Sequence, residues 1–332
     1  MKKKLMHMKS IRNSSINKDP YKPIISELLR ILKSSDVKHH LLLGSCSRNE
    51  HRYIISNDSI IGLSDIELIV FSSNNDKISS EIGLLSDRYK KKLGSVFSID
   101  VDFLPVWRYP FLKNRFIFFE GLKNSRNVPK LIKKIILSKK FDKIELSQTI
   151  IWRFFKILKK LEKELDTNNN SKIFKYFIAR NILDLHAVYL YLNDNKLHSI
   201  TLRKEYLLSN NNCIFPSNLL KSCYEVFGNS NQLLINDDYS LGIKDFRLCL
   251  NIIIDYMINN NIKILPNYYQ LLKRFIFSNS NLSILHKRFL ISDKMFLIKF
   301  KSLIKSETTS LNDSKVFSSE FSDLLPYLSN FK

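Results

Sequence analysis

The sequence predicts an α+β fold, in which a small mixed-sheet domain is followed by an all-helical domain. Up to about residue 125, short apolar segments typical of strands alternate with helical patterns. Beyond that point, long stretches with helical periodicity are separated by breaks rich in Asn and Ser. We therefore expect a flexible basic arm over residues 1–19, the mixed-sheet domain over 20–125 and the helical domain over 126–332.

The mixed-sheet domain is expected to begin with a helix, a strand, a polar loop and a second strand. A strand over 37–43 ends abruptly at Gly44, and a polar loop over 49–63 follows it. The second strand covers 65–71 and is bounded by Ser and Asn residues. The first helix begins after Pro20, and its apolar stripe consists of Ile24, Leu28, Leu29 and Leu32.

A helix and two further strands are expected to complete this domain. The helix covers 76–92, and the alternating segment VFSIDVDFLPV predicts a strand over 96–106. A short apolar run predicts another strand over 115–119. In the helical domain, the clearest helices are expected over 150–165 and 173–192.

The net charge is strongly positive, at +22 with a pI near 9.7. Such a charge favours a polyanionic partner, which includes RNA, DNA, an anionic lipid surface and nucleotide phosphates. An AT-rich coding sequence would explain the charge equally well. The chain is rich in Lys, Asn, Ile, Phe, Tyr and Ser and contains only 7 Gly and 8 Pro, as such a coding sequence yields. The charge alone therefore does not decide the substrate.

Nothing in the sequence indicates export, a membrane span or a cysteine-based site. The basic start of the chain lacks the apolar stretch of a signal peptide, and no apolar run approaches the roughly 20 residues of a membrane span. We therefore expect a cytoplasmic protein without integral membrane association. The cysteines form no CxxC pair, so neither a zinc site nor a disulfide framework is indicated; they are Cys46, Cys213, Cys223 and Cys249.

Acidic residues within two apolar strands predict a metal site. Asp65 and Glu67 lie two apart on one strand, so both project from the same face. Asp100 lies on the next strand, between apolar neighbours, where a third carboxylate can join them; Asp102 shares its face and is the alternative. Three carboxylates that converge repel one another, and such an arrangement persists mainly where a metal neutralises it.

The turn after the first strand has the features of a phosphate-binding turn. Gly44 has no side chain to keep a phosphate away from the backbone N–H groups, and Ser45 adds a hydroxyl donor. Arg48 follows shortly after. Its side chain is expected either to reach a phosphate or to lie on the surface of a short helix.

Together these segments resemble a known superfamily. LLLGS, LSDIELIVF and FSIDVDFLPV resemble the DNA polymerase beta-like nucleotidyltransferases, and most closely the small-molecule branch that includes the aminoglycoside nucleotidyltransferases. The resemblance covers roughly residues 38–121. It implies that Asp65 and Glu67 hold Mg²⁺, and that Gly44 and Ser45 contact the β- and γ-phosphates. Asp100 is then a metal ligand or the base that deprotonates the acceptor hydroxyl.

The resemblance implies transfer of a nucleoside monophosphate from an NTP, with ATP as the expected nucleotide, to an acceptor hydroxyl. Two Mg²⁺ ions are expected, one of them carried by the NTP. A small-molecule acceptor is expected, and an RNA or protein hydroxyl, including a toxin–antitoxin role, is the alternative. A non-catalytic nucleic-acid-binding protein with a degenerate site is a further alternative.

A second, weaker resemblance lies in the helical domain. Arg180, Asn181 and His186 match the R-N-x₄-H element of HEPN ribonucleases, in which such residues flank a scissile phosphate. This spacing arises readily by chance. A solvated arginine and an ordinary helical histidine are the more frequent explanation.

Overall fold

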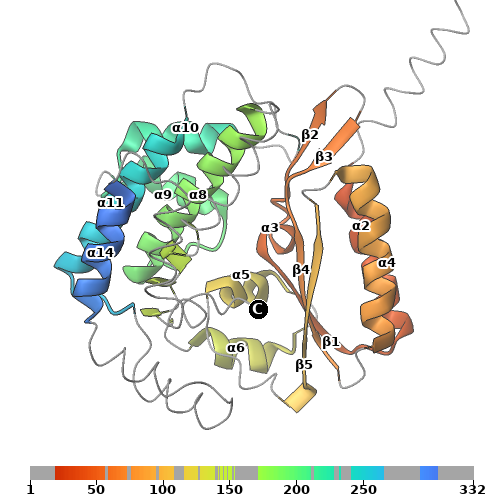
Figure 1. Ribbon diagram of the computed structural model, residues 1–332. Helices are drawn as coiled ribbons and strands as arrows, with labels where there is room; N and C mark the ends of the chain where they lie inside the picture. The colour runs from red at the N-terminus through yellow and green to blue at the C-terminus, as the bar shows by residue number, and fades with distance from the viewer. Residues whose placement is uncertain are drawn as a thin grey trace, which may run out of the picture. The chain divides into compact units, whose positions relative to one another are not determined.

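The computed structural model describes residues 19–56, 59–72, 76–94, 97–107, 116–125, 128–138, 141, 143–144, 146–147, 149–151, 153, 171–210, 213–227, 232, 241–264 and 292–305. These residues contain helices and a small mixed sheet, which confirms the α+β class (Figure 1). The chain divides into two compact units. The sheet unit consists of Met1–Phe111, Asn124–Lys130 and Asn229–Leu234, and the helical unit of Leu112–Lys123, Leu131–Gly228 and Ile235–Lys332.

The sheet unit is built on three strands in the order β1-β4-β5. β1 (His39–Leu43) is antiparallel to β4 (Ile66–Phe71), and β4 is parallel to β5 (Ile99–Leu104). Parallel neighbours need a long crossover connection, and α4 (Asp76–Leu93) provides it. The strands expected over 65–71 and 96–106 and the helix expected over 76–92 are therefore all confirmed, with slightly different ends.

The core of the sheet unit lies between the sheet and two helices. Figure 1 shows α2 (Tyr21–Ser34) beside α4, on the same side of the sheet. Alternate residues of β4 point towards these helices, because side chains alternate across a strand. The buried side chains of this core include Ile66, Leu68 and Val70 from β4 and Ile24, Leu28 and Leu32 from α2. Leu29, the fourth member of the expected stripe, is 41% exposed.

Two expectations for residues 20–125 are corrected. The expected loop over 49–63 contains a hairpin of β2 (Tyr53–Ser56) and β3 (Ser59–Gly62). The segments YIIS and SIIG each carry β-branched pairs that favour strands, although polar residues surround them. The expected strand over 115–119 belongs instead to helix α5 (Phe116–Asn124). A short apolar run does not distinguish a strand from part of a buried helix.

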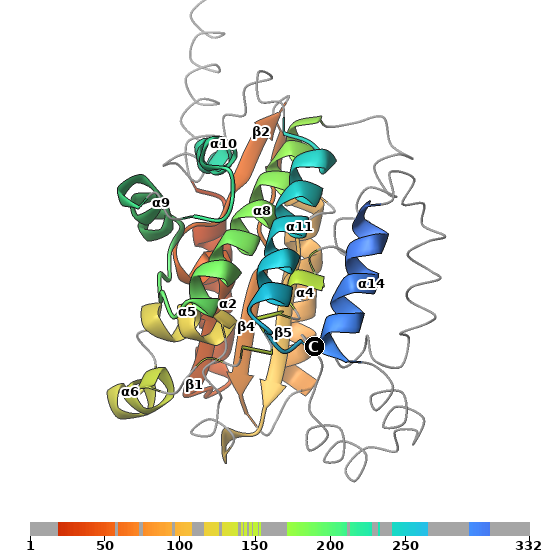
Figure 2. The same ribbon diagram turned by 90° about the vertical axis from the view of Figure 1, so that its left-hand side faces the viewer.

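Helix α8 (Ser171–Leu192) is the centre of the helical unit, and it confirms the helix expected over 173–192. It packs against α10 (Ser217–Phe227) and α11 (Ile243–Asn259), and α11 also packs against α14 (Asp293–Lys305) (Figure 2). The helix expected over 150–165 lies mostly outside the described residues. Among the helices that can be described, none is both long and apolar enough to cross a membrane. The described residues also form helices α6 (Lys130–Ser138) and α9 (Ile200–Ser209).

Candidate functional site

The turn after β1 brings a glycine against a carboxylate. Gly44 starts the short helix α3 (Gly44–Ser47) with φ of 61°, a left-handed conformation that favours glycine. A Cβ atom at this position would lie only 2.8 Å from Glu67 Oε2. The antiparallel pairing of Leu43 with Glu67 explains this closeness, because Gly44 directly follows Leu43. Any side chain at Gly44 would therefore be strained and would displace the carboxylate.

The register of the sheet places two of the predicted acids side by side. Glu67 on β4 is the partner of Asp100 on β5, so both side chains project from the same face of the sheet. This face is opposite to the one that carries Leu68 and contacts α2 and α4. Glu67 is half-buried, whereas Asp100 is exposed. Asp102 is also exposed, but it pairs with Ile69, about 6–7 Å farther along the strands.

Asp65 lies just before β4, and the thiol of Cys46 senses the charges of both Asp65 and Glu67. Burial, together with the negative charges of Glu67 and Asp65, raises the pKa of the Cys46 thiol to about 12. Both carboxylates therefore lie within electrostatic reach of one sulfur atom. Cys46 Sγ also donates a hydrogen bond to the backbone oxygen of Asp65, at 3.6 Å. The thiol is protonated at neutral pH and links α3 to the acidic segment.

Arg48 forms an ion pair rather than lying on the surface. Its Nε donates to Glu50 Oε2 at 2.6 Å, and the two side chains are only 11% and 10% exposed. The backbone oxygen of Ser45 accepts from the N–H groups of Arg48 and Glu50, at 3.3 and 2.8 Å. Arg48 and Ser45 are therefore held together at the end of α3. Sequence reasoning missed Glu50, because nothing in the sequence around it indicates an ion pair across a turn.

A buried tyrosine from α2 contacts the residue that precedes the acids. The Tyr21 hydroxyl donates to the backbone oxygen of Ser64 at 2.7 Å and accepts from the Ser64 N–H at 3.0 Å. Both residues are fully buried. Sequence reasoning missed this contact, because the two partners are 43 residues apart and a tyrosine at the start of a helix carries no functional signal.

The carboxylates on this face of the sheet suit a metal ion that a substrate also binds. Within the described ranges, no three His, Cys, Asp or Glu side chains gather closely enough to hold a metal by themselves. Glu67 and Asp100 nevertheless offer neighbouring carboxylates on one face of the sheet. Mg²⁺ is usually held by one or two carboxylates together with oxygens of substrate phosphates. These residues therefore suit Mg²⁺ bound together with a nucleotide.

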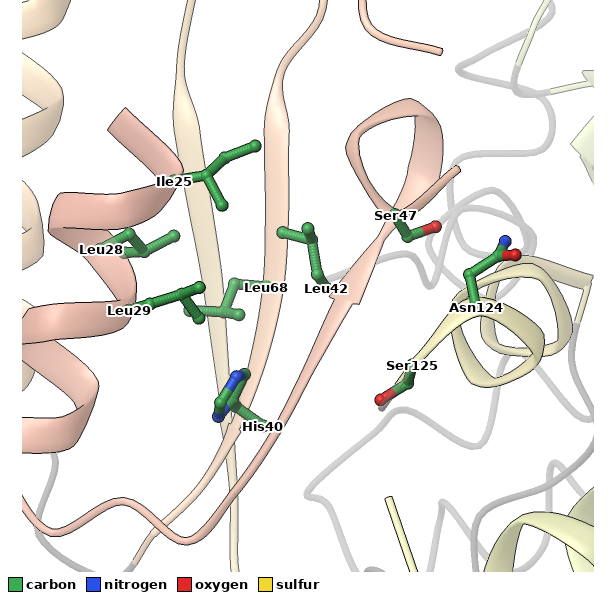
Figure 3. A pocket seen from close by; sticks show the side chains of 9 residues that line it. All are labelled: Ile25, Leu28, Leu29, His40, Leu42, Ser47, Leu68, Asn124 and Ser125. Atoms are coloured by element: carbon green, nitrogen blue, oxygen red, sulfur yellow. The ribbon is translucent and has the colours of Figure 1, made fainter. Parts of the chain in front are cut away.

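A cavity of about 140 Å³ lies beside β1, the edge strand of the sheet. Asp65, Glu67 and Asp100 are not among the residues that line it. Figure 3 shows leucine side chains from α2 and β1 on one side and Ser47, Asn124 and Ser125 on the other. His40 also lines it, and burial lowers the pKa of His40. The cavity is therefore separate from the face that carries Glu67 and Asp100.

The R-N-x₄-H residues of α8 do not form an exposed site. His186 is fully buried, its Nδ1 lies 2.9 Å from the Tyr224 hydroxyl, and burial lowers its pKa to about 3. Asn181 is 3% exposed and donates to the backbone oxygen of Phe177 at 2.7 Å. Neither side chain is accessible to a scissile phosphate. The structure therefore supports a packing role for both residues and gives no support to the HEPN resemblance.

No protein-family model, curated protein or solved structure matches this chain.

Proposed function

We propose that this protein is a Mg²⁺-dependent nucleotidyltransferase that transfers a nucleoside monophosphate from an NTP, with ATP as the expected nucleotide, to an acceptor hydroxyl. The observation that carries the proposal is the pairing of Glu67 with Asp100 on one face of the sheet, next to the Gly44 turn. Neighbouring acids beside a glycine turn suit metal-assisted phosphate chemistry. In this proposal the sheet unit binds the nucleotide. The proposed location of the protein is the cytoplasm.

The acids have different roles in this proposal. Glu67 and Asp65 would hold Mg²⁺, which supplies neutralisation of the negative charge that develops on the phosphates. Asp100 is exposed, so an acceptor hydroxyl can approach its carboxylate. Asp100 would either share the metal or take the hydroxyl proton. The acceptor oxygen then forms a bond to the α-phosphorus, the bond to the β-phosphate oxygen breaks, and pyrophosphate leaves.

The residues around the turn would bind and orient the triphosphate. Gly44 and Ser45 are proposed to contact the β- and γ-phosphates. Arg48 supplies positive charge at the same turn, where Glu50 holds its guanidinium in a largely buried position. This fixed arrangement favours positioning, because little conformational freedom is lost when a substrate binds.

We propose a small-molecule acceptor, as the resemblance to the aminoglycoside branch implies. The net charge of +22 favours an RNA acceptor as the second candidate, since Lys and Arg attract phosphate backbones. Labelled NTP offered with a panel of small polyols, RNA and proteins decides between them by where the label is transferred. Binding of RNA without any consumption of NTP would favour a non-catalytic nucleic-acid-binding protein.

The proposal predicts that Asp65→Ala and Glu67→Ala each abolish Mg²⁺-dependent consumption of NTP, because each removes a carboxylate beside the phosphates. Pyrophosphate release measures the reaction, and thermal unfolding shows whether the variants stay folded. Asp87→Ala is a matched control, because Asp87 is an exposed acid on α4 of the same unit. Turnover by both variants at the rate of this control would overturn the proposal.

A further inference from the structure

We propose that Tyr21 is a positioning residue, whose hydroxyl fixes the backbone of Ser64 and thereby holds Asp65 and Glu67 in place for a metal ion. This inference rests on the proposed function, because it concerns the same carboxylates. Tyr21 itself is fully buried, so its side chain would act without contacting metal or substrate. It acts through the segment that carries the acids.

One side-chain atom satisfies both backbone groups of Ser64. The Tyr21 hydroxyl donates to the Ser64 oxygen at 2.7 Å and accepts from the Ser64 N–H at 3.0 Å. β4 begins only at Ile66, so Ser64 lies outside the ladder of the sheet. The hydroxyl therefore takes the place that a neighbouring strand would have, directly before Asp65.

The surrounding residues keep the hydroxyl in this position. A Cβ atom at Gly62 would lie 2.8 Å from the Tyr21 hydroxyl, so the glycine provides the space that the phenol occupies. The Tyr21 ring lies 4.6 Å from the His51 ring, measured between centroids. His51 Nε2 lies 2.8 Å from a carboxylate oxygen of Asp19, and Asp19 also accepts from the Tyr21 N–H at 3.0 Å. The hydroxyl, the ring and the backbone N–H of Tyr21 therefore each contact a neighbouring residue that restricts their position.

Other elements fix the next residues of the same segment. The Ile66 N–H donates to the backbone oxygen of Ser98 at 2.9 Å, just before β5. Cys46 Sγ donates to the backbone oxygen of Asp65 at 3.6 Å, from α3. The segment from Ser64 to Ile66 is thus held from α2, α3 and the start of β5. Tyr21 makes two of these bonds, so we expect its hydroxyl to contribute most to the position of Asp65.

Loss of the hydroxyl should disturb the acids more than the fold. In Tyr21→Phe the ring still fills the core, but two buried backbone groups of Ser64 lose their partner. The backbone must then shift to find other partners. Mg²⁺ tolerates little deviation from octahedral geometry, so such a shift weakens binding at the adjacent carboxylates.

The test compares Tyr21→Phe with Tyr89→Phe. Tyr89 is a matched control, because its hydroxyl donates to Glu27 at 3.3 Å, between α4 and α2, without touching the acidic segment. We expect Mn²⁺, measured by electron paramagnetic resonance with an unreactive ATP analogue, to bind about 10- to 100-fold more weakly to Tyr21→Phe. Amide hydrogen exchange over residues 63–67 should also be faster. A merely structural role would lower the folded fraction without changing the Mn²⁺ affinity of the folded molecules.

Each outcome decides the inference. Equal Mn²⁺ affinity and equal exchange in the two variants would overturn it, even if the wild type consumes NTP. If the wild type binds no Mn²⁺ with the nucleotide, the proposed function fails, and hydrogen exchange over 63–67 still shows whether Tyr21 fixes this segment. If Tyr21→Phe does not fold, Gly62→Ala replaces it, because the added methyl group displaces the hydroxyl without removing it.

Discussion

Glu67 and Asp100 are far apart in the chain and adjacent in the sheet, because the parallel register of β4 and β5 pairs them. From the sequence, Asp100 was the expected third acid and Asp102 remained the alternative, since both lie on one face of the same strand. The register distinguishes them, as Asp100 and not Asp102 is the partner of Glu67, the acid that approaches Gly44. At the scale of single residues, the site therefore depends on which positions face each other across two strands.

This difference predicts that Asp100→Asn reduces NTP turnover by about 100-fold or more, as loss of a general base or a metal ligand does. Asp102→Asn should change turnover little, because Asp102 lies farther along the strand. Initial rates of pyrophosphate release at saturating Mg²⁺ give the comparison. Both acids are exposed, so thermal unfolding should be similar for the two variants. A larger loss in Asp102→Asn would transfer the role to that residue.

Helix α5 shows what decides an element that the sequence leaves ambiguous. Its apolar start resembled a strand, but Glu120 within it forms a buried ion pair with Arg203 of α9, at 2.7 Å. The Tyr191 hydroxyl of α8 also donates to Glu120, at 3.4 Å. These partners come from later parts of the chain, and the pair joins α5 to α9 within the helical unit. A local apolar run carries no information about such partners.

We predict that Arg203→Met destabilises the protein by about 3–5 kcal/mol, because it leaves the buried Glu120 carboxylate without its countercharge. The double variant Glu120→Leu with Arg203→Met should lose much less stability, since a well-packed apolar pair often replaces a buried ion pair at little cost. Urea unfolding measures both. An equal loss in the single and double variants would show that packing rather than charge explains the effect.

Across the whole molecule, buried histidines make stability depend on pH. Burial lowers the pKa of His186 to about 3 and also lowers the pKa of His40 and of His51, although Asp19 opposes the shift at His51. A lowered pKa means that the folded state binds the proton more weakly than the unfolded state. Between pH 6.5 and about 3, the unfolded chain therefore gains a proton at His186 that the folded chain does not.

Stability should consequently fall as the pH decreases below about 6.5, with His186 contributing up to about a factor of ten in the folding equilibrium for each pH unit. Above that pH the contribution of His186 is fully present and constant. Thermal unfolding from pH 7 to pH 4, in a buffer of constant ionic strength, measures the slope. His186→Gln should flatten the slope, because the substitution removes the buried imidazole. An unchanged slope in His186→Gln would contradict this prediction.

The sequence by itself determined the α+β class, the two strands that carry acids and the helix between these strands. It also determined the candidate residues Gly44, Asp65 and Glu67. These features depend on local information, because periodicity, turn residues and alternation are properties of neighbouring positions. Only the tertiary structure decided that Asp100 rather than Asp102 lies beside Glu67, that Glu50 holds Arg48, and that Tyr21 contacts Ser64. Those contacts join residues through strand register, a tight turn and helix packing, which the order of the residues does not contain.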